Sequence, residues 1–144
     1  MALRSVAEAL HQLLADVPLW GAESRNLAQA QGAILAADVC AQIDVPPLDN
    51  SAMDGYALRL SDLGAGASLR ISQRIPAGAN PCALQAGTAA RIFTGASIPA
   101  GADTVVAQED CELVGDMLQV NTVPRLGQHI RPRGQDIAAG QRIL

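Results

Sequence analysis

The chain has 144 residues, of which nearly half are apolar and only 17% are charged, and this composition excludes an intrinsically disordered protein. The formal net charge is −4 and all ten positive charges are arginines, which disfavours a nucleic-acid-binding protein because such proteins usually carry a basic surface. No run approaches the roughly 18 apolar residues that a membrane span requires, and the N-terminal pattern is not that of a secretory signal. We therefore expect a cytoplasmic globular protein with one core, or one core and a small satellite lobe.

The first predicted element is an amphipathic helix near the N-terminus. Ser5 and Glu8 form an S-x-x-E capping box at its start, and Pro18 ends it. Its apolar stripe recurs at helical spacing and consists of Leu3, Val6, Leu10, Leu13, Leu14 and Val17. This combination of cap and periodicity predicts a helix in the first seventeen residues.

A second, shorter helix is predicted over Gln29–Ala37. Its inward face would consist of Ala30, Ile34 and Leu35, which recur at helical spacing. Gly32 lies inside this segment and costs roughly 1 kcal/mol relative to alanine, so the limits of the helix are less well defined.

The next segment, Val45–Leu58, reads V-P-P-L-D-N-S-A-M-D-G-Y-A-L and is rich in turn-forming residues. Its two prolines favour an extended entry, and its Asp, Asn and Ser side chains can hydrogen-bond their own backbone. We predict a rigid, folded-back loop that presents two carboxylates, Asp49 and Asp54. The alternative is a plain connection between two elements, since Pro/Asn/Asp/Gly clusters usually have that role.

Short β-like runs separated by turn signals follow this loop. They are Ser68–Ser72, Ala89–Thr94, Asp103–Gln108, Cys111–Val114 and Met117–Thr122. Gly115-Asp116, between the last two runs, suits a two-residue type II′ hairpin loop. Two copies of I-P-A-G-A, at residues 75–79 and 98–102, predict turns with Pro at the second position and Gly at the fourth.

The segment after Pro124 contains several glycines and few apolar residues, so it cannot form a core alone. We expect it to run back beside the N-terminal helices. This predicts an elongated, discontinuous lobe (residues 1–44 plus 124–144) that is interrupted by a compact β domain (residues 45–123). The predicted fold class is α+β, mostly β.

Three places could carry chemistry: the loop with Asp49 and Asp54, the Thr94-Gly95 turn, and the segment from Arg133 to Asp136. A threonine at the end of a strand more often caps its own turn than binds a ligand. The Arg/Asp mixture in the last segment is compatible with surface ion pairs of small energetic weight. Both alternatives stay open.

Three stretches resemble one family in the same order along the chain. P-P-L-D-N-S-A-M-D-G-Y-A-L (residues 46–58) resembles the signature loop of the molybdopterin molybdenumtransferases, the family of bacterial MoeA and the gephyrin E domain. R-I-F-T-G-A-S-I-P-A-G-A-D-T-V-V-A-Q-E (Arg91–Glu109) and R-P-R-G-Q-D-I-A-A-G (Arg131–Gly140) resemble the same family. Members of the family are much longer, so the chain resembles only their N-terminal portion.

The resemblance implies a reaction in which molybdate is inserted into adenylylated molybdopterin with magnesium, and AMP is released. Carboxylates repel molybdate, but they can accept hydrogen bonds from the amide-amine edge of a pterin or bind magnesium. By resemblance, Asp54, Thr94 and Asp136 are the expected catalytic residues, and Asp54 and Asp136 the expected metal ligands. The expected substrate-binding residues are Asp49, Ser51, Gly95 and Arg133.

The resemblance also implies that a later C-terminal domain, absent here, carries most of the active site and that the full-length protein is a homodimer. The chain alone is therefore expected to be inactive. One alternative is a non-catalytic dimerisation or docking module, akin to the scaffold use of the gephyrin E domain. Another is an unrelated small β domain that binds an anion through its arginine-rich tail.

Overall fold

The structure is a computed structural model that describes residues 4–18, 20–64 and 68–144. It forms two compact units, Met1–Asp38 and Val39–Leu144. The described residues contain one α-helix, three single-turn 3₁₀-helices and eight strands, which confirms the prediction of a mostly β chain. No helix among the described residues is long and apolar enough to cross a membrane.

The first unit contains α1 (Val6–Ala15), where the capping box predicts it. The Ser5 backbone N–H donates to the Glu8 carboxylate at 2.9 Å, and the Glu8 backbone N–H donates to the Ser5 hydroxyl at 3.3 Å. The Ser5 hydroxyl also donates to the Glu8 carboxylate at 3.0 Å, and the two bonds that this carboxylate accepts, first the one from the Ser5 backbone N–H, hold the pKa of Glu8 below its usual value. The predicted helix is confirmed, except that Leu3 lies outside the described residues.

The predicted second helix over residues 29–37 is wrong. The segment has only the single-turn η1 (Leu27–Gln29), followed by a turn in which the Ala33 N–H donates to the Ala30 carbonyl at 3.0 Å. Gly32 takes a positive φ of 81°, which stops any continuation of the helix. Ile34, expected on the inward face, is almost fully exposed.

The second unit is organised around a curled six-stranded sheet with the order β5-β2-β4-β3-β7-β6. Its strands are β2 (Gly55–Leu58), β3 (Leu69–Ile75), β4 (Thr88–Ile92), β5 (Thr104–Ala107), β6 (Cys111–Val114) and β7 (Met117–Val120). All neighbours are antiparallel except β3 and β4. All five β runs predicted from the sequence are confirmed: Cys111–Val114 has the predicted ends, and the ends of the other four differ slightly.

The prediction that residues 45–58 form a loop is wrong for the last four residues. They are β2, an inner strand paired with β4 on one side and β5 on the other, and all four residues are buried. A strand buried on both faces lacks the alternation of apolar and polar residues by which a half-buried strand is recognised. Gly55 begins the strand because only glycine fits there: a Cβ would lie 2.0 Å from the carbonyl oxygen of Val106 on β5.

Each face of the sheet carries its own small core, since successive residues of a strand point to opposite faces. One core contains Ala57, Ile75, Leu84, Ala90, Ile92, Ala96 and Val105, and the other contains Tyr56, Leu58, Leu69, Ala89, Val106 and Leu118. The central strands therefore cannot shift without disturbing both cores.

The three predicted turns form where the sequence places them, but the two I-P-A-G-A turns begin one residue later than predicted. The β6–β7 hairpin has the predicted two-residue loop, and Gly115 has a φ of 62° as a type II′ turn requires. In the two I-P-A-G-A turns, the Pro carbonyl accepts from the N–H of the last alanine, at 3.1 Å and 3.0 Å. Pro therefore occupies the first position of each turn and Gly the third, whereas the sequence predicts the second and fourth positions. Gly78 and Gly101 take positive φ there, as a type II turn requires.

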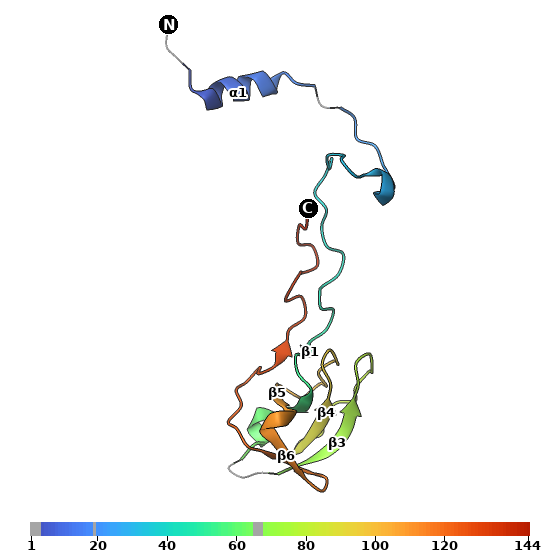
Figure 1. Cartoon of the computed structure of the whole chain (residues 1–144), viewed down its shortest axis with the longest axis vertical. Helices are drawn as coiled ribbons and strands as arrows, with labels where there is room; N and C mark the ends of the chain where they lie inside the picture. Colours follow the sequence, from blue (N-terminus) through green and yellow to red (C-terminus); the bar gives the residue numbers. More distant parts are fainter. Residues whose placement is uncertain (1–3, 19, 65–67) are drawn as a thin grey trace. The chain divides into compact units, whose positions relative to one another are not determined.

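Residues 39–51 and 130–144 run side by side as an antiparallel stem that leads away from the sheet (Figure 1). Where the stem meets the sheet, β1 (Asn50–Ser51) pairs with β8 (Ile130–Arg131). Bridges between Cys40 and Arg142 and between Val45 and Ile137 continue the pairing. The division into an elongated lobe (1–44 plus 124–144) and a β domain (45–123) stays a prediction.

Candidate functional site

The side chains of Asp54 and Thr94 form a direct pair beside the start of β2. Pairing of Gly55 with Ile92 brings the residue before β2 close to the segment that follows β4. Asp54 Oδ1 accepts two hydrogen bonds from Thr94, one from the backbone N–H at 2.8 Å and one from the hydroxyl at 2.7 Å. Two predicted site residues forty positions apart are therefore in contact.

This pair offers hydrogen-bond acceptors to its surroundings. The hydrogen bonds from the Thr94 backbone N–H and hydroxyl hold the pKa of Asp54 below its usual value, and the charge of Arg91 lowers it further. The carboxylate is therefore ionised at neutral pH. Since both recorded bonds fall on Oδ1, Oδ2 and the threonine oxygen keep lone pairs that can accept hydrogen bonds from N–H or O–H groups. Such a site suits a donor-rich edge and repels an oxyanion.

Ser51 and Gly95 shape the loop next to this pair. The buried Ser51 hydroxyl donates to the Met53 carbonyl at 2.6 Å and accepts from the Met53 N–H at 3.3 Å. The Gly95 N–H donates to the Ser51 carbonyl at 2.8 Å, and Gly95 has a φ of 80°. Both residues fix the backbone around Asp54 and Thr94, and their assignment to substrate binding stays a prediction.

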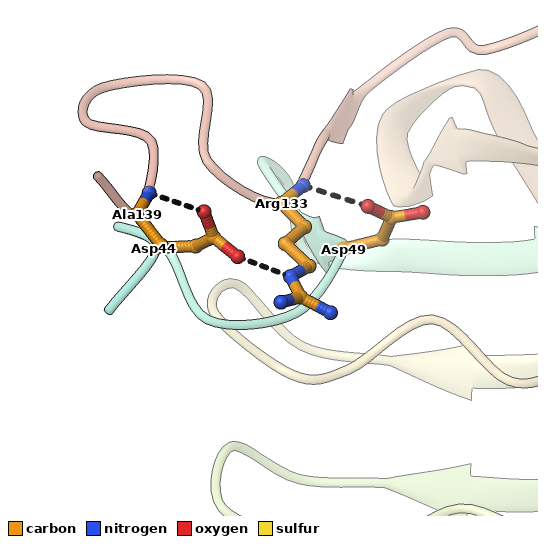
Figure 2. A network of polar contacts seen from close by, with 4 residues as sticks. All are labelled: Asp44, Asp49, Arg133 and Ala139. Atoms are coloured by element: carbon orange, nitrogen blue, oxygen red, sulfur yellow. Dashed lines mark hydrogen bonds and ion pairs between the residues drawn. The ribbon is translucent and has the colours of Figure 1, made fainter. Parts of the chain in front are cut away.

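Asp49 and Arg133 belong to a second cluster in the stem, which we call the Asp44 network and which contains Asp44, Asp49, Arg133 and Ala139 (Figure 2). The backbone N–H of Arg133 donates to Asp49 at 2.7 Å, and its guanidinium donates to Asp44. Asp44 also accepts from the Ala139 N–H at 2.8 Å. That bond, followed by the one from Arg133, holds the pKa of Asp44 below its usual value.

Asp136 lies in an ion pair with Arg131 at 2.8 Å, with both side chains about half exposed. The structure therefore brings Asp54 and Thr94 together, but it gives Asp136 a different partner. No group of three His, Cys, Asp or Glu side chains among the described residues could hold a metal ion. The assignment of Asp54 and Asp136 as metal ligands stays a prediction.

An open groove of about 370 Å³ lies beside the Asp44 network. It is lined by Leu48, Asp49, Asn80, Pro81, Ser97, Ile98, Ala100 and Arg133. Two predicted substrate-binding residues, Asp49 and Arg133, therefore share one surface. The Asp54–Thr94 pair does not line this groove.

Sequence reasoning missed Asp44 and Arg91. Asp44 precedes the V-P-P turn, and its partners are 89 and 95 residues away, so no local pattern marks it. Arg91 interrupts the apolar run of β4 and is half-buried, and a lone charge inside a strand of alanines and isoleucine is a signal that could have found it.

Comparison with known proteins connects this geometry to a family. The model of the MoeA N-terminal region (domain I and II) matches residues 4–144. The chain belongs to this family. Two curated relatives of this MoeA N-terminal chain are 42% identical: molybdopterin molybdenumtransferase 2 of Mycobacterium tuberculosis, over 82% of this chain, and molybdopterin molybdenumtransferase of a Nostoc species, over 83%. The Synechococcus elongatus molybdopterin molybdenumtransferase is 38% identical over 97% of this chain.

A solved structure agrees with the same assignment. The molybdopterin biosynthesis MoeA protein of Pyrococcus horikoshii matches 99% of this chain with a TM-score of 0.81 and 30% identity. This chain covers 38% of that structure, and 31%, 29% and 37% of the three curated relatives. The MoeA N-terminal chain thus spans about a third of the length of its relatives.

Proposed function

We propose that this chain is the N-terminal part of a molybdopterin molybdenumtransferase that acts in molybdenum cofactor biosynthesis in the cytoplasm. In the proposed reaction molybdate is inserted into adenylylated molybdopterin and AMP is released. Membership of the MoeA N-terminal family and the names of relatives at 38–42% identity support the assignment. The chain covers about a third of those relatives, and we propose that the part of them it does not cover carries the rest of the active site.

The observation that carries the proposed role of the site is the Asp54–Thr94 pair. Thr94 donates both of its hydrogen bonds to Oδ1 of the ionised Asp54 carboxylate. The other oxygen, Oδ2, can therefore accept hydrogen bonds from the amide-amine edge of a pterin. We place molybdate against other groups, because a carboxylate repels an oxyanion. Asp136 is proposed to line the same cleft, while Asp49, Ser51, Gly95 and Arg133 support its walls.

The complete enzyme is proposed to be a homodimer in which this region closes the cleft. In that arrangement residues 1–44 and 124–144 form the elongated lobe and residues 45–123 the β domain. A magnesium ion usually keeps several waters and binds one or two carboxylates together with substrate phosphates, so Asp54 and Asp136 would supply only part of its ligands.

A chimaera tests the proposal. The N-terminal third of the Mycobacterium tuberculosis relative is replaced by this chain, and AMP release from adenylylated molybdopterin is measured with molybdate and magnesium present. Asp54→Asn preserves the shape of the side chain but removes its charge, and we expect activity to fall about ten- to a hundredfold, since a hydrogen bond to a charged group contributes about 1.5–3 kcal/mol. Asp116→Asn, in the β6–β7 hairpin loop, is the matched control and should leave activity unchanged.

Three results would contradict the proposal. Full activity of the Asp54→Asn chimaera would remove Asp54 from the site, and an active Asp136→Ala chimaera would remove Asp136. Enzyme-like AMP release by the isolated chain would show that it needs no further domain.

The second candidate is a non-catalytic dimerisation or docking module, and the exposed apolar residues of α1 favour it. Val6, Leu10, Leu13 and Leu14 are all more than half exposed. Sedimentation of the isolated chain would show a dimer that Leu10→Glu and Leu13→Glu dissociate. A docking module alone would leave the Asp54→Asn chimaera as active as its parent.

A further inference from the structure

Arg91 links strand β4 to strand β2 and to Gln108, the residue that follows β5. It is on β4, directly opposite Tyr56 on β2. Its guanidinium donates to the Gly55 carbonyl at 2.9 Å and to its neighbour's carbonyl, Ile92, at 3.2 Å. Its second terminal nitrogen, Nη2, donates to the side-chain oxygen of Gln108, the residue after β5, at 2.6 Å.

The same guanidinium contacts two aromatic rings. Its carbon is 4.5 Å from the centre of the Phe93 ring and 5.3 Å from that of Tyr56. Arg74 on β3 also lies over Phe93, at 4.7 Å. Guanidinium groups are attracted to aromatic faces, most strongly where water is partly excluded, and Arg91 is half-buried. These contacts leave its side chain few alternative positions.

Several groups that Arg91 touches are attached to the Asp54–Thr94 pair. Gly55 follows Asp54, and Phe93 precedes Thr94. The backbone N–H of Gln108 donates to the Asp54 carbonyl at 3.0 Å, so the third partner is also tied to Asp54. Arg91 therefore fixes the backbone on both sides of the two hydrogen bonds that join the pair.

We infer that Arg91 is a positioning residue that sets the geometry of the Asp54–Thr94 pair through Gly55, Phe93 and Gln108. Its relevance to catalysis rests on the proposed function, whereas its effect on the pair does not. Arginine is specifically suited to this role, because its planar fork reaches two acceptors while stacking on a ring, and a lysine ammonium does not.

The charge of Arg91 also acts on Asp54 directly, and it reinforces the lowering of the Asp54 pKa by Thr94. The other charged side chains on the neighbouring β3 and η3 (Gln108–Asp110) are Arg70, Arg74, Glu109 and Asp110. Arg74 is therefore the natural comparison, since it contacts Phe93 without a recorded hydrogen bond to Gly55 or Gln108.

The test compares Arg91→Lys, Arg91→Met and the control Arg74→Met in the 144-residue chain by NMR. In Arg91→Lys, which keeps the charge and the alkyl stem, we expect hydrogen exchange of the Thr94 amide to accelerate about tenfold. In Arg91→Met, the pKa of Asp54, followed by its carboxyl ¹³C shift, should rise as well. Arg74→Met should change neither quantity, although both methionine variants remove a ring contact.

Unchanged exchange at Thr94 in Arg91→Lys would overturn the inference, and that variant decides the matter if Arg91→Met fails to fold. A merely structural brace would lower the thermal stability of Arg91→Lys without accelerating hydrogen exchange of the Thr94 amide. In the chimaeric enzyme we expect Arg91→Lys to lower kcat/KM about tenfold. A parent chimaera without activity would contradict the proposed function and leave the amide measurements to judge Arg91.

Discussion

Replacing Gly55 by alanine should test how tightly the central strands hold the candidate site. The added Cβ would lie 2.0 Å from the carbonyl oxygen of Val106 and 3.2 Å from Cα of Ala107, and both atoms belong to the backbone of β5. No side-chain rotation can relieve this contact. Real Cβ atoms do not approach closer than about 3.0 Å, so β2 and β5 must separate by at least about 1 Å at that point.

A separation of that size breaks the nearest ladder bonds between β2 and β5. Losing about two of them costs roughly 2–3 kcal/mol, and the lower entropy of the unfolded alanine chain returns about 0.4–1 kcal/mol. We therefore expect a net destabilisation of about 2 kcal/mol. For a unit of about 100 residues this lowers Tm by about 8–12 °C. Because Asp54 precedes Gly55, its hydrogen bonds with Thr94 should weaken in the same variant.

Calorimetry and far-UV circular dichroism measure the change, with two glycines as controls. Gly21→Ala adds a Cβ with nothing within 4 Å, so its Tm should stay within about 2 °C of the parent. Gly78→Ala also meets no atom, but its φ of +80° imposes a conformational cost of about 1 kcal/mol. If Gly55→Ala were no less stable than Gly78→Ala, the steric reasoning would be refuted.

Three further predictions concern hydrogen bonds and one thiol. Thr94→Val removes the hydroxyl donor to Asp54, so the pKa of Asp54 should rise toward its usual value in a carboxyl ¹³C titration. The pKa of Asp54 is lower in the folded parent than in the unfolded chain, so the bond from the Thr94 hydroxyl stabilises the parent relative to Thr94→Val at pH values above the unfolded pKa. This difference is lost as the pH falls through the folded pKa. Urea unfolding midpoints measured as a function of pH would show it. Burial raises the pKa of Cys111 to about 11, so about one Cys111 side chain in a thousand is a thiolate at pH 8. Iodoacetamide should therefore modify Cys111 only after unfolding, which mass spectrometry would measure. Asp44→Asn removes the charged acceptor of the Ala139 N–H, and hydrogen exchange at that amide should accelerate severalfold.

Each of these predictions can fail in a distinct way. An unchanged Asp54 titration in Thr94→Val would mean that the threonine hydroxyl does not contribute to the lowered carboxyl pKa. Equal alkylation rates for the three cysteines of the folded chain would contradict the burial of Cys111, because Cys40 and Cys82 are exposed. Exchange at Ala139 that does not respond to Asp44→Asn would show that the stem holds without that carboxylate.

Elements with local determinants could be predicted from the sequence. The capping box of Ser5 and Glu8 marks the start of α1, and Gly115 marks the β6–β7 hairpin, because each signal lies within a few residues of the structure it causes. Strand β2 could not be predicted, since its burial comes from β4 and β5, which are distant in the sequence. The prediction of a second helix was wrong for the opposite reason. Its local apolar pattern has no packing partner, and the positive φ of Gly32 ends the helical turn.

The candidate site shows the same division. The residue types at Asp54 and Thr94 could be singled out from the turn chemistry and the resemblance to the family. Their contact depends on the register of Gly55 with Ile92, which only the folded sheet defines. The support from Arg91 depends on partners 17 and 36 residues away, so no window of the sequence contains it.

The antiparallel pairing of residues 39–51 with 130–144 brings the polypeptide out of the six-stranded sheet next to where it entered. A module whose two ends are neighbours can be excised and the gap closed with a short linker, or grafted into another host, without stretching either chain. The segment between Asn50 and Arg131 can therefore be exchanged between proteins as one piece, and it contains Asp54, Thr94 and Arg91. Exchanging that segment among relatives would transfer the Asp54–Thr94 pair and its contacts with Arg91 as a single unit.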